Sequence, residues 1–145
     1  MMKLSKRTRY GVRAVMELAE KTEKGPLQLR VIARRQDISP KYLEQLMATL
    51  KSAGLVRSIR GAKGGYVLAK PPDKIRLNWV FRCLEGPVVI AECVEDEKLC
   101  QRAADCAARL VWAEVQEAIE QILGAITLQD LIDKTRPHSS VNYNI

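Results

Sequence analysis

The chain has 145 residues, of which 47% are hydrophobic, and a formal net charge of +7 at pH 7. This length allows one compact domain with one additional element. No apolar run approaches the ~18 residues of a membrane span and no signal-peptide core follows the basic N-terminus, so we expect a cytoplasmic protein. The sequence also lacks a recognisable nucleophile–base pair or phosphate-binding loop, which argues against an enzyme.

The charge is unevenly distributed. Residues 1–76 contain 18 Lys and Arg against 6 Asp and Glu, a net +12. Residues 77–145 contain 6 against 11, a net −5, and the two halves sum to +7. A basic half joined to an acidic half favours one module that faces a polyanion such as nucleic acid, although a solvated basic surface is the simpler alternative.

The first half of the chain predicts a winged helix-turn-helix. Hydrophobic periodicity and capping residues predict helices over residues 5–21, 29–36, 40–54 and 77–84. An alternating strand at 55–60, a glycine-rich tip at 61–65 and a returning strand at 66–68 predict a β-hairpin between the third and fourth helices. We therefore expect an α+β fold, mainly α, with residues 1–86 as a DNA-binding domain.

The second half predicts a cysteine-bearing loop and a helix that pairs with a second copy. Residues 87–105 lack periodicity, and a long helix is predicted to begin near Cys106. Its apolar residues step by three and four, as in the seam of paired helices, and are Trp112, Val115, Ile119, Ile122 and Ile126. Thr127 and Asp130 predict the start of a short last helix that ends near 133, followed by a mobile polar tail at 134–145.

Candidate DNA-binding residues lie on three of these elements. In a winged helix-turn-helix the third helix enters the major groove, where Glu44 can accept from cytosine and Gln45 can pair with adenine. A basic wing suits the minor groove, and cations on the first helix can neutralise phosphates. Tyr42 has an alternative role in packing against the first helix. The predicted contacts are Arg7, Arg9, Lys41, Tyr42, Glu44, Gln45, Arg60 and Lys63.

Cys93, Cys100 and Cys106 predict an iron–sulfur sensor site. Thiolates are the usual ligands of such clusters, and their loose spacing on a polar loop would let three sulfur atoms converge. Zinc sites more often contain a close Cys-x2-Cys pair, which is missing here. Cys83, on an apolar helix, is expected to pack as a small hydrophobic residue. The alternative is a metal-free protein whose cysteines sense oxidants.

Two segments carry a resemblance to a known family. The two segments are MKLSKRTRYGVRAVMELA, from Met2, and ISPKYLEQLMATLKSAGLVRSIRGAKGGYVLAKPPDKI, from Ile38. They resemble the IscR/NsrR/CymR-type (Rrf-two) family of bacterial regulators, and YLEQL and RGxxGGY are specific to that family. The resemblance extends to about Asp133. It implies homodimers on near-palindromic double-stranded operators. Members of the IscR, NsrR and RirA groups have a similar three-cysteine loop, whereas CymR-like members lack it.

The chain departs from this family pattern at two positions. Arg109 replaces the histidine expected three residues after the last cysteine in IscR, and Arg9 matches the aspartate expected in NsrR. The fourth cluster ligand therefore stays open among Cys83, a small thiol and the carboxylates of Glu92, Glu95, Glu97 and Asp105, with His138 less favoured. A 2Fe–2S cluster is favoured over a 4Fe–4S cluster.

By this resemblance we expect an iron–sulfur-dependent repressor of cluster-assembly genes. The alternative is a regulator of nitric-oxide, iron or cysteine metabolism in the same family, either metal-free with thiol-redox sensing or controlled by a protein partner.

Overall fold

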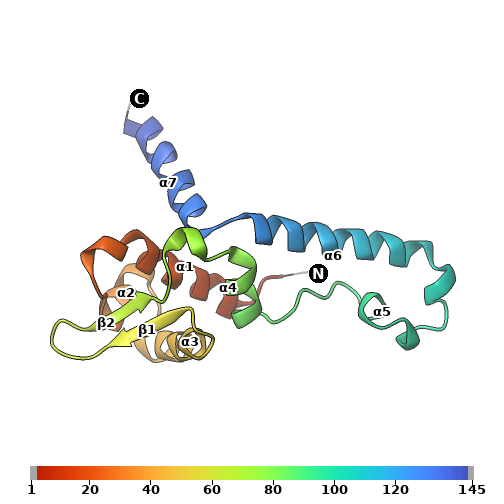
Figure 1. The fold of residues 1–145 in the computed structure, drawn as a ribbon, viewed down its shortest axis with the longest axis horizontal. Helices are drawn as coiled ribbons and strands as arrows, with labels where there is room; N and C mark the ends of the chain where they lie inside the picture. The colour runs from red at the N-terminus through yellow and green to blue at the C-terminus, as the bar shows by residue number, and fades with distance from the viewer. Residues whose placement is uncertain (1–2, 144–145) are drawn as a thin grey trace.

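A computed structural model describes residues 3–143 of the chain, with side chains for residues 3–135. It contains seven α-helices and one two-stranded antiparallel sheet, which confirms the predicted fold class. The helices and strands are α1 (Lys6–Glu20), α2 (Leu29–Gln36), α3 (Pro40–Ser52), β1 (Val56–Ile59), β2 (Gly65–Leu68), α4 (Leu77–Leu84), α5 (Glu92–Glu95), α6 (Ala107–Ala125) and α7 (Leu128–Tyr143). Figure 1 shows α1–α4 and the hairpin gathered into a head, from which α6 extends as a long arm.

The core of the head forms where the apolar faces of α1, α2 and α3 meet. Val15, Ile32, Leu43, Met47 and Leu50 are each fully buried there. Because the apolar residues of each helix recur at helical spacing, one face enters the core and the polar face stays outside. The sequence therefore predicts these helices well, and their observed bounds agree with the predicted ones to within two residues.

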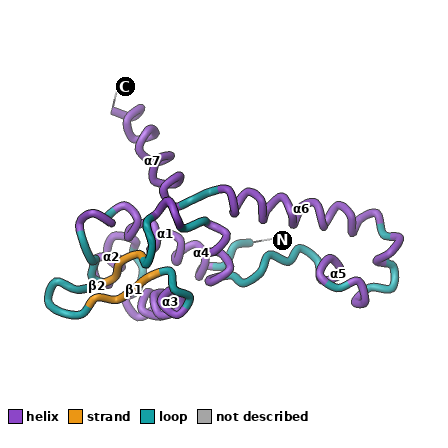
Figure 2. Tube along the Cα trace, in the orientation of Figure 1, coloured by secondary structure: helices purple, strands orange, loops and turns teal. Residues whose placement is uncertain are grey.

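The β-hairpin, or wing, is attached to the head by the chain segment that precedes α2. β1 and β2 pair from Val56↔Leu68 to Ile59↔Gly65. On the other edge of β2, Tyr66 exchanges two backbone hydrogen bonds of 2.8 and 3.0 Å with Leu27, which precedes α2. The position of the hairpin is thus fixed relative to the helix-turn-helix. Figure 2 shows the two strands, in orange, within the head.

The arm is formed by α6 and the chain that returns alongside it. The segment after α4 runs beside α6, forms α5 and short turns, and enters α6 at Cys106 (Figure 1). No residue of α6 is buried in this chain. The base of the arm is held by the hydrogen bond from Leu77 N to Ile126 O, 2.8 Å long, and the bond from Leu128 N to Ile75 O, 3.0 Å long.

The last helix is longer than the sequence predicted. Thr127 and Asp130 form the predicted reciprocal cap, with N···O distances of 2.9 and 3.1 Å. Leu128 and Ile132 are buried against the head, and the helix continues past the expected end near 133 to Tyr143. Residues 144–145, the end of the tail predicted to be mobile, lie outside the described residues. Within the described chain no helix is long and apolar enough to cross a membrane.

Candidate nucleic-acid interface and cysteine segment

The N-terminus of α3 is well defined by its cap. Ser39 Oγ accepts a hydrogen bond from the Tyr42 backbone N–H at 3.1 Å, and Pro40 occupies the first turn. Both features favour helix initiation at this point. The side of α3 that faces away from the core is exposed and polar at Lys41, Glu44 and Gln45. These are three of the side chains that the sequence predicts for DNA contact.

Tyr42, also predicted to contact DNA, packs against α1. Its ring meets the Tyr10 ring edge-on, with centroids 6.1 Å apart and an interplanar angle of 81°. Lys6 and Arg13 place their charged groups 5.8 and 5.2 Å from the Tyr10 ring centroid. Tyr42 is only partly buried, so this aromatic pair orients α3 on α1 while part of the side chain stays accessible.

Three exposed cations of α1, among them the predicted Arg7 and Arg9, differ in their partners. Arg7 donates to Thr49 Oγ1 of α3 at 2.9 Å, so it joins the two helices. Arg13 donates to the side chain and backbone oxygens of Gln36 at 2.8 and 2.5 Å. Arg9 is exposed and makes no hydrogen bond or ion pair with any described side chain. Of these three cations, Arg9 is therefore the most readily available to a phosphate.

The wing tip presents Arg60 and Lys63 to solvent. Gly61 has a φ of +110° and open space around it, and Gln28 Nε2 donates to the Ala62 carbonyl at 3.5 Å. This last contact joins the tip to the residue that precedes α2. The wing is therefore oriented by the helix-turn-helix itself.

A buried carboxylate that the sequence reasoning did not identify holds α2 on α1. Glu17 accepts from Gln36 Nε2 at 2.5 Å, and its other oxygen lies 3.7 Å from Arg35 Nε without accepting a hydrogen bond. The position lies on the apolar face of α1, between Ala14 and Leu18. A glutamate at such a position is the signal that could have indicated a buried polar contact.

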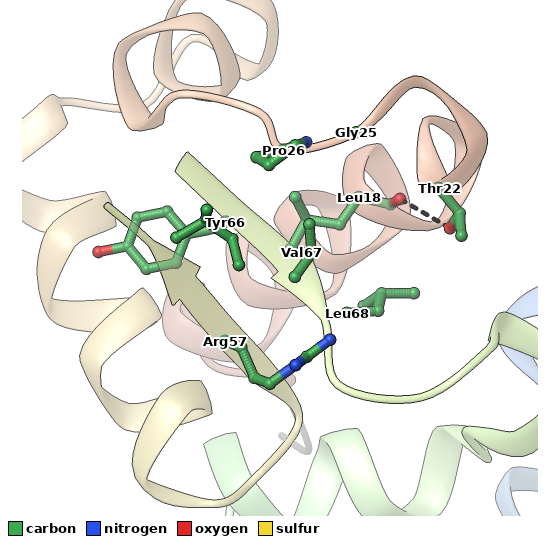
Figure 3. Close-up of a pocket in the computed structure, with 9 residues that line it drawn as sticks. Leu18, Thr22, Gly25, Pro26, Arg57, Tyr66, Val67 and Leu68 are labelled. Carbon is green, nitrogen blue, oxygen red and sulfur yellow. Dashed lines mark hydrogen bonds between the residues drawn. The ribbon is translucent and has the colours of Figure 1, made fainter. Parts of the chain in front are cut away.

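A pocket opens between the end of α1 and the hairpin (Figure 3). Arg57 is its only charged lining residue, and Thr22 Oγ1 donates to the Leu18 carbonyl at 3.1 Å. The lining holds no carboxylate, histidine or cysteine that could act with Arg57 in acid–base or nucleophilic chemistry. The other lining residues are Gly25, Pro26, Ile59, Tyr66, Val67 and Leu68.

The three predicted ligand cysteines lie on separate turns of the arm. Cys93 is in α5, Cys100 follows a short turn at Glu97–Leu99, and Cys106 is the N-cap of α6. All are free thiols. Among the described side chains, no group of three or more Cys, His, Asp or Glu residues is placed to hold a metal ion. The donors thus suit an iron–sulfur cluster chemically, but their positions here do not form its ligand set.

Cys83 differs from these three. It is half-buried on α4 and packs against the core of the head. Burial raises the pKa of its thiol above the ordinary value, so less of it is thiolate at neutral pH. This environment agrees with the packing role expected from the sequence.

Two residues of α6 hold the cysteine segment in place. Arg109 Nε donates to the Cys93 carbonyl at 2.8 Å, and its guanidinium lies 3.2 Å from Glu97 Oε1. Gln116 accepts from the Ile90 backbone N–H at 3.1 Å and donates to Glu95 Oε1 at 2.6 Å. The sequence identified Arg109 only as a missing ligand, and these contacts give it a structural role.

Another side of α6 is apolar and exposed. Val111, Ala118 and Ile122 recur at spacings of seven and four residues, which places them along one side of the helix. Of the predicted seam, Trp112 and Ile122 are 43% and 60% exposed. Val115, Ile119 and Ile126 are partly buried within this chain. The exposed apolar strip of α6 therefore overlaps the predicted seam and is displaced to one side of it.

Known proteins resemble the chain along most of its length. Residues 4–134 match the Rrf2 family, described as iron-dependent transcriptional regulators. The transcriptional regulator CymR of Bacillus subtilis (strain 168) is 43% identical over 134 residues, 92% of each chain. IscR of Erwinia tasmaniensis is 36% identical over 132 residues, which cover 91% of this chain and 79% of that protein.

Solved structures agree with these relatives. The structure of CymR, described as the global cysteine regulator of B. subtilis, matches with a TM-score of 0.80 at 42% identity over 92% of this chain and 98% of that one. IscR of T. potens matches with a TM-score of 0.76 at 39% identity, covering 92% and 88%. These relatives are transcriptional regulators and not enzymes. The chain belongs to the Rrf2 family of DNA-binding transcriptional regulators.

Proposed function

We propose that this chain is a homodimeric, cytoplasmic repressor that binds a near-palindromic operator and senses its signal through the cysteine segment. One observation carries the proposal: a helix with a capped N-terminus and an exposed polar side lies beside a basic wing, on a head joined to an arm that bears three thiols. Charge supports this division, because residues 87–125 of the arm contain 3 Lys and Arg against 8 Asp and Glu. DNA would repel the acidic arm and attract the head.

In this proposal α3 enters the major groove. Glu44 and Gln45 read base edges, because their side chains leave the exposed side of α3 near its N-terminus. Lys41, Arg7 and Arg9 contact phosphates, and the tip residues Arg60 and Lys63 enter the adjacent minor groove. Tyr42 contacts the DNA with the part of its ring that Tyr10 leaves uncovered.

This division of roles is tested with two alanine variants on a set of operator sequences. Gln45→Ala is expected to cost about 1–3 kcal/mol of binding free energy and to relax specificity at one base pair. Lys63→Ala is expected to weaken binding to every sequence equally and to reduce the salt dependence by about one ion. The reverse pattern would contradict the assignment. Lys24→Ala is the control, because Lys24 is an exposed cation outside the proposed interface.

For the sensor we propose an iron–sulfur cluster bound by Cys93, Cys100 and Cys106, with a 2Fe–2S cluster favoured. When bound, such a cluster supplies a redox-responsive group whose presence reports iron and sulfide supply. The thiols do not form a ligand set in the described conformation, so binding through all three requires the segment to rearrange. The controlled genes on this proposal are those of cluster assembly.

The cysteine assignment is tested on oxygen-free protein reconstituted with iron and sulfide. Cys93→Ala, Cys100→Ala and Cys106→Ala are each expected to abolish the visible absorbance and the bound iron. Cys83→Ala is the matched control and should keep both, because Cys83 packs on the core. If all three variants bind iron and sulfide as well as the control does, the ligand assignment is wrong.

A second candidate is a metal-free regulator that responds to thiol oxidation or to a protein partner. Two observations favour it: the high identity to CymR and the separate positions of the three thiols. Iron and sulfide analysis of the same oxygen-free protein separates the candidates. Absence of both elements after reconstitution, with operator binding that responds to oxidants, would support the second.

A further inference from the structure

We infer that Arg109, together with Gln116, is a positioning residue that fixes the conformation of the cysteine segment on α6. Arg109 lies three residues after Cys106, and its side chain is only 19% exposed. Its two contacts reach different parts of the segment, the main chain at Cys93 and the carboxylate of Glu97. A rigid guanidinium can bridge two acceptors in this way.

Gln116 extends the contact along the helix. It is seven residues after Arg109, so two turns of α6 bring both side chains to the same side. Gln116 uses both ends of its amide, accepting from Ile90 N and donating to Glu95 Oε1. The two residues therefore contact the segment on both sides of Cys93 and at Cys93 itself.

The contacts of Arg109 and Gln116 lie on the side of α6 opposite to its exposed apolar strip. The exposed strip of Val111, Ala118 and Ile122 is turned about 150° away from Arg109 and Gln116 on a helix of 100° per residue. The cysteine segment thus covers one side of α6 and leaves the opposite side free for a second copy. A change in the conformation of the segment would therefore change the contacts of α6, the helix proposed to join the dimer. This regulatory meaning rests on the proposed function, whereas the positioning role rests on the contacts alone.

The positioning role is tested on the reduced, metal-free, full-length chain. The rate of alkylation at each cysteine by N-ethylmaleimide is measured by peptide mass spectrometry, with amide hydrogen exchange over residues 92–99 as a second readout. Arg109→Gln is expected to raise the alkylation rate of Cys93 and exchange in this region about 5-fold. Cys83 is the internal reference and should not change.

Three further variants separate positioning from a general loss of stability. Arg102→Gln is the control, because the Arg102 side chain is exposed in the same segment and makes no hydrogen bond or ion pair with the described residues. Arg109→Lys should restore protection only in part, since one ammonium cannot reproduce the fork that reaches Cys93 and Glu97. Glu97→Gln should give a smaller change of the same sign. If Arg109→Gln leaves Cys93 alkylation and exchange at 92–99 equal to those of Arg102→Gln, the inference is overturned.

Operator affinity of the same variants distinguishes this inference from the proposed function. Faster alkylation in Arg109→Gln with altered operator affinity supports both. Faster alkylation with unchanged operator affinity supports the positioning role. It would contradict the proposal that the cysteine segment controls operator binding.

Discussion

At the level of single residues, Glu85 joins the end of α4 to the start of α1. Its carboxylate accepts from Ser5 Oγ at 2.6 Å, from the Ser5 backbone N–H at 3.4 Å and from the Thr8 hydroxyl. These hydrogen bonds, chiefly from the Ser5 and Thr8 side chains, lower the pKa of Glu85 below its ordinary 4.5. Glu85 immediately precedes the segment that leads to the cysteines, so this contact ties the root of the arm to the head.

The lowered pKa predicts an acid-sensitive contribution to stability. Because the folded chain binds the Glu85 proton less tightly than the unfolded chain, the contribution is complete above the unfolded pKa and is lost as the pH falls through the folded one. At neutral pH, Glu85→Gln is expected to lower the free energy of unfolding by about 0.5 kcal/mol, a value reduced for the solvent exposure of the carboxylate. As the pH falls below the folded pKa, the variant and the parent should converge.

Urea unfolding of both proteins at neutral pH and at decreasing acidic pH measures this difference. Glu114→Gln is the control, since the Glu114 side chain is exposed on α6 and makes no hydrogen bond or ion pair with the described residues. If Glu85→Gln lowers the free energy of unfolding by the same amount in acid, the loss is due to altered packing and not to the lost carboxylate charge.

At the level of elements, the wing depends on glycine for its attachment to the head. Gly65 has a φ of +146°, and a Cβ built there would lie 2.2 Å from the Leu27 carbonyl oxygen. Gly64 is equally close-packed, with a Cβ position 2.0 Å from the Ile59 carbonyl oxygen. In the structure Gly64 and Gly65 permit close approach to the backbone of the chain itself.

Gly65→Ala is therefore expected to destabilise the protein by about 2–4 kcal/mol, because both backbone strain and a collision with Leu27 must be relieved. Gly61→Ala is the matched variant at the same tip. It has a φ of +110° and nothing within 4 Å, so it should cost only the strain, about 1 kcal/mol. Thermal unfolding compares the two, and equal losses would contradict a role for the Leu27 contact.

The elements differ in how far the sequence predicts them. Helices α1–α4 were predicted because each buries a periodic apolar face, and the Ser5 and Ser39 caps are local signals read within four residues. The extension of α7 to Tyr143 was not predicted, because residues 134–143 are mostly polar and show no apolar periodicity.

The candidate sites were likewise predicted only where a local sequence pattern encodes them. The exposed side of α3 could be read from the periodicity of one helix. The contacts of Glu85 with Ser5 and of Arg109 with Cys93 join residues 80 and 16 positions apart, and no local pattern encodes them. Sequence reasoning therefore located the elements that carry the sites, while the side chains that hold those elements together required the structure.

At the level of the whole molecule, the arm is acidic and the head is basic. Helix α6 of the arm also exposes apolar side chains. Leu110, Val111, Trp112 and Ile122 of α6 are all at least 43% exposed. An exposed apolar strip on a helix that extends away from the core is typical of an interaction surface. We propose a second copy of the chain as its occupant, because a helix-turn-helix dimer reads two half-sites about one turn of DNA apart, ~34–36 Å.

Ile122→Glu is accordingly expected to raise the dimer dissociation constant by roughly 30- to 1000-fold, the equivalent of about 2–4 kcal/mol, because a carboxylate would enter an apolar interface. Leu99→Glu is the matched control, since Leu99 is 62% exposed but lies on the cysteine segment and not on α6. Analytical ultracentrifugation gives the assembly state, and binding to full and half operators gives the consequence. The Ile122 variant should bind a full operator no more tightly than a half-site, while Leu99→Glu keeps the preference for the full operator. If Ile122→Glu stays dimeric at the concentrations at which the parent does, the paired surface lies elsewhere on the arm.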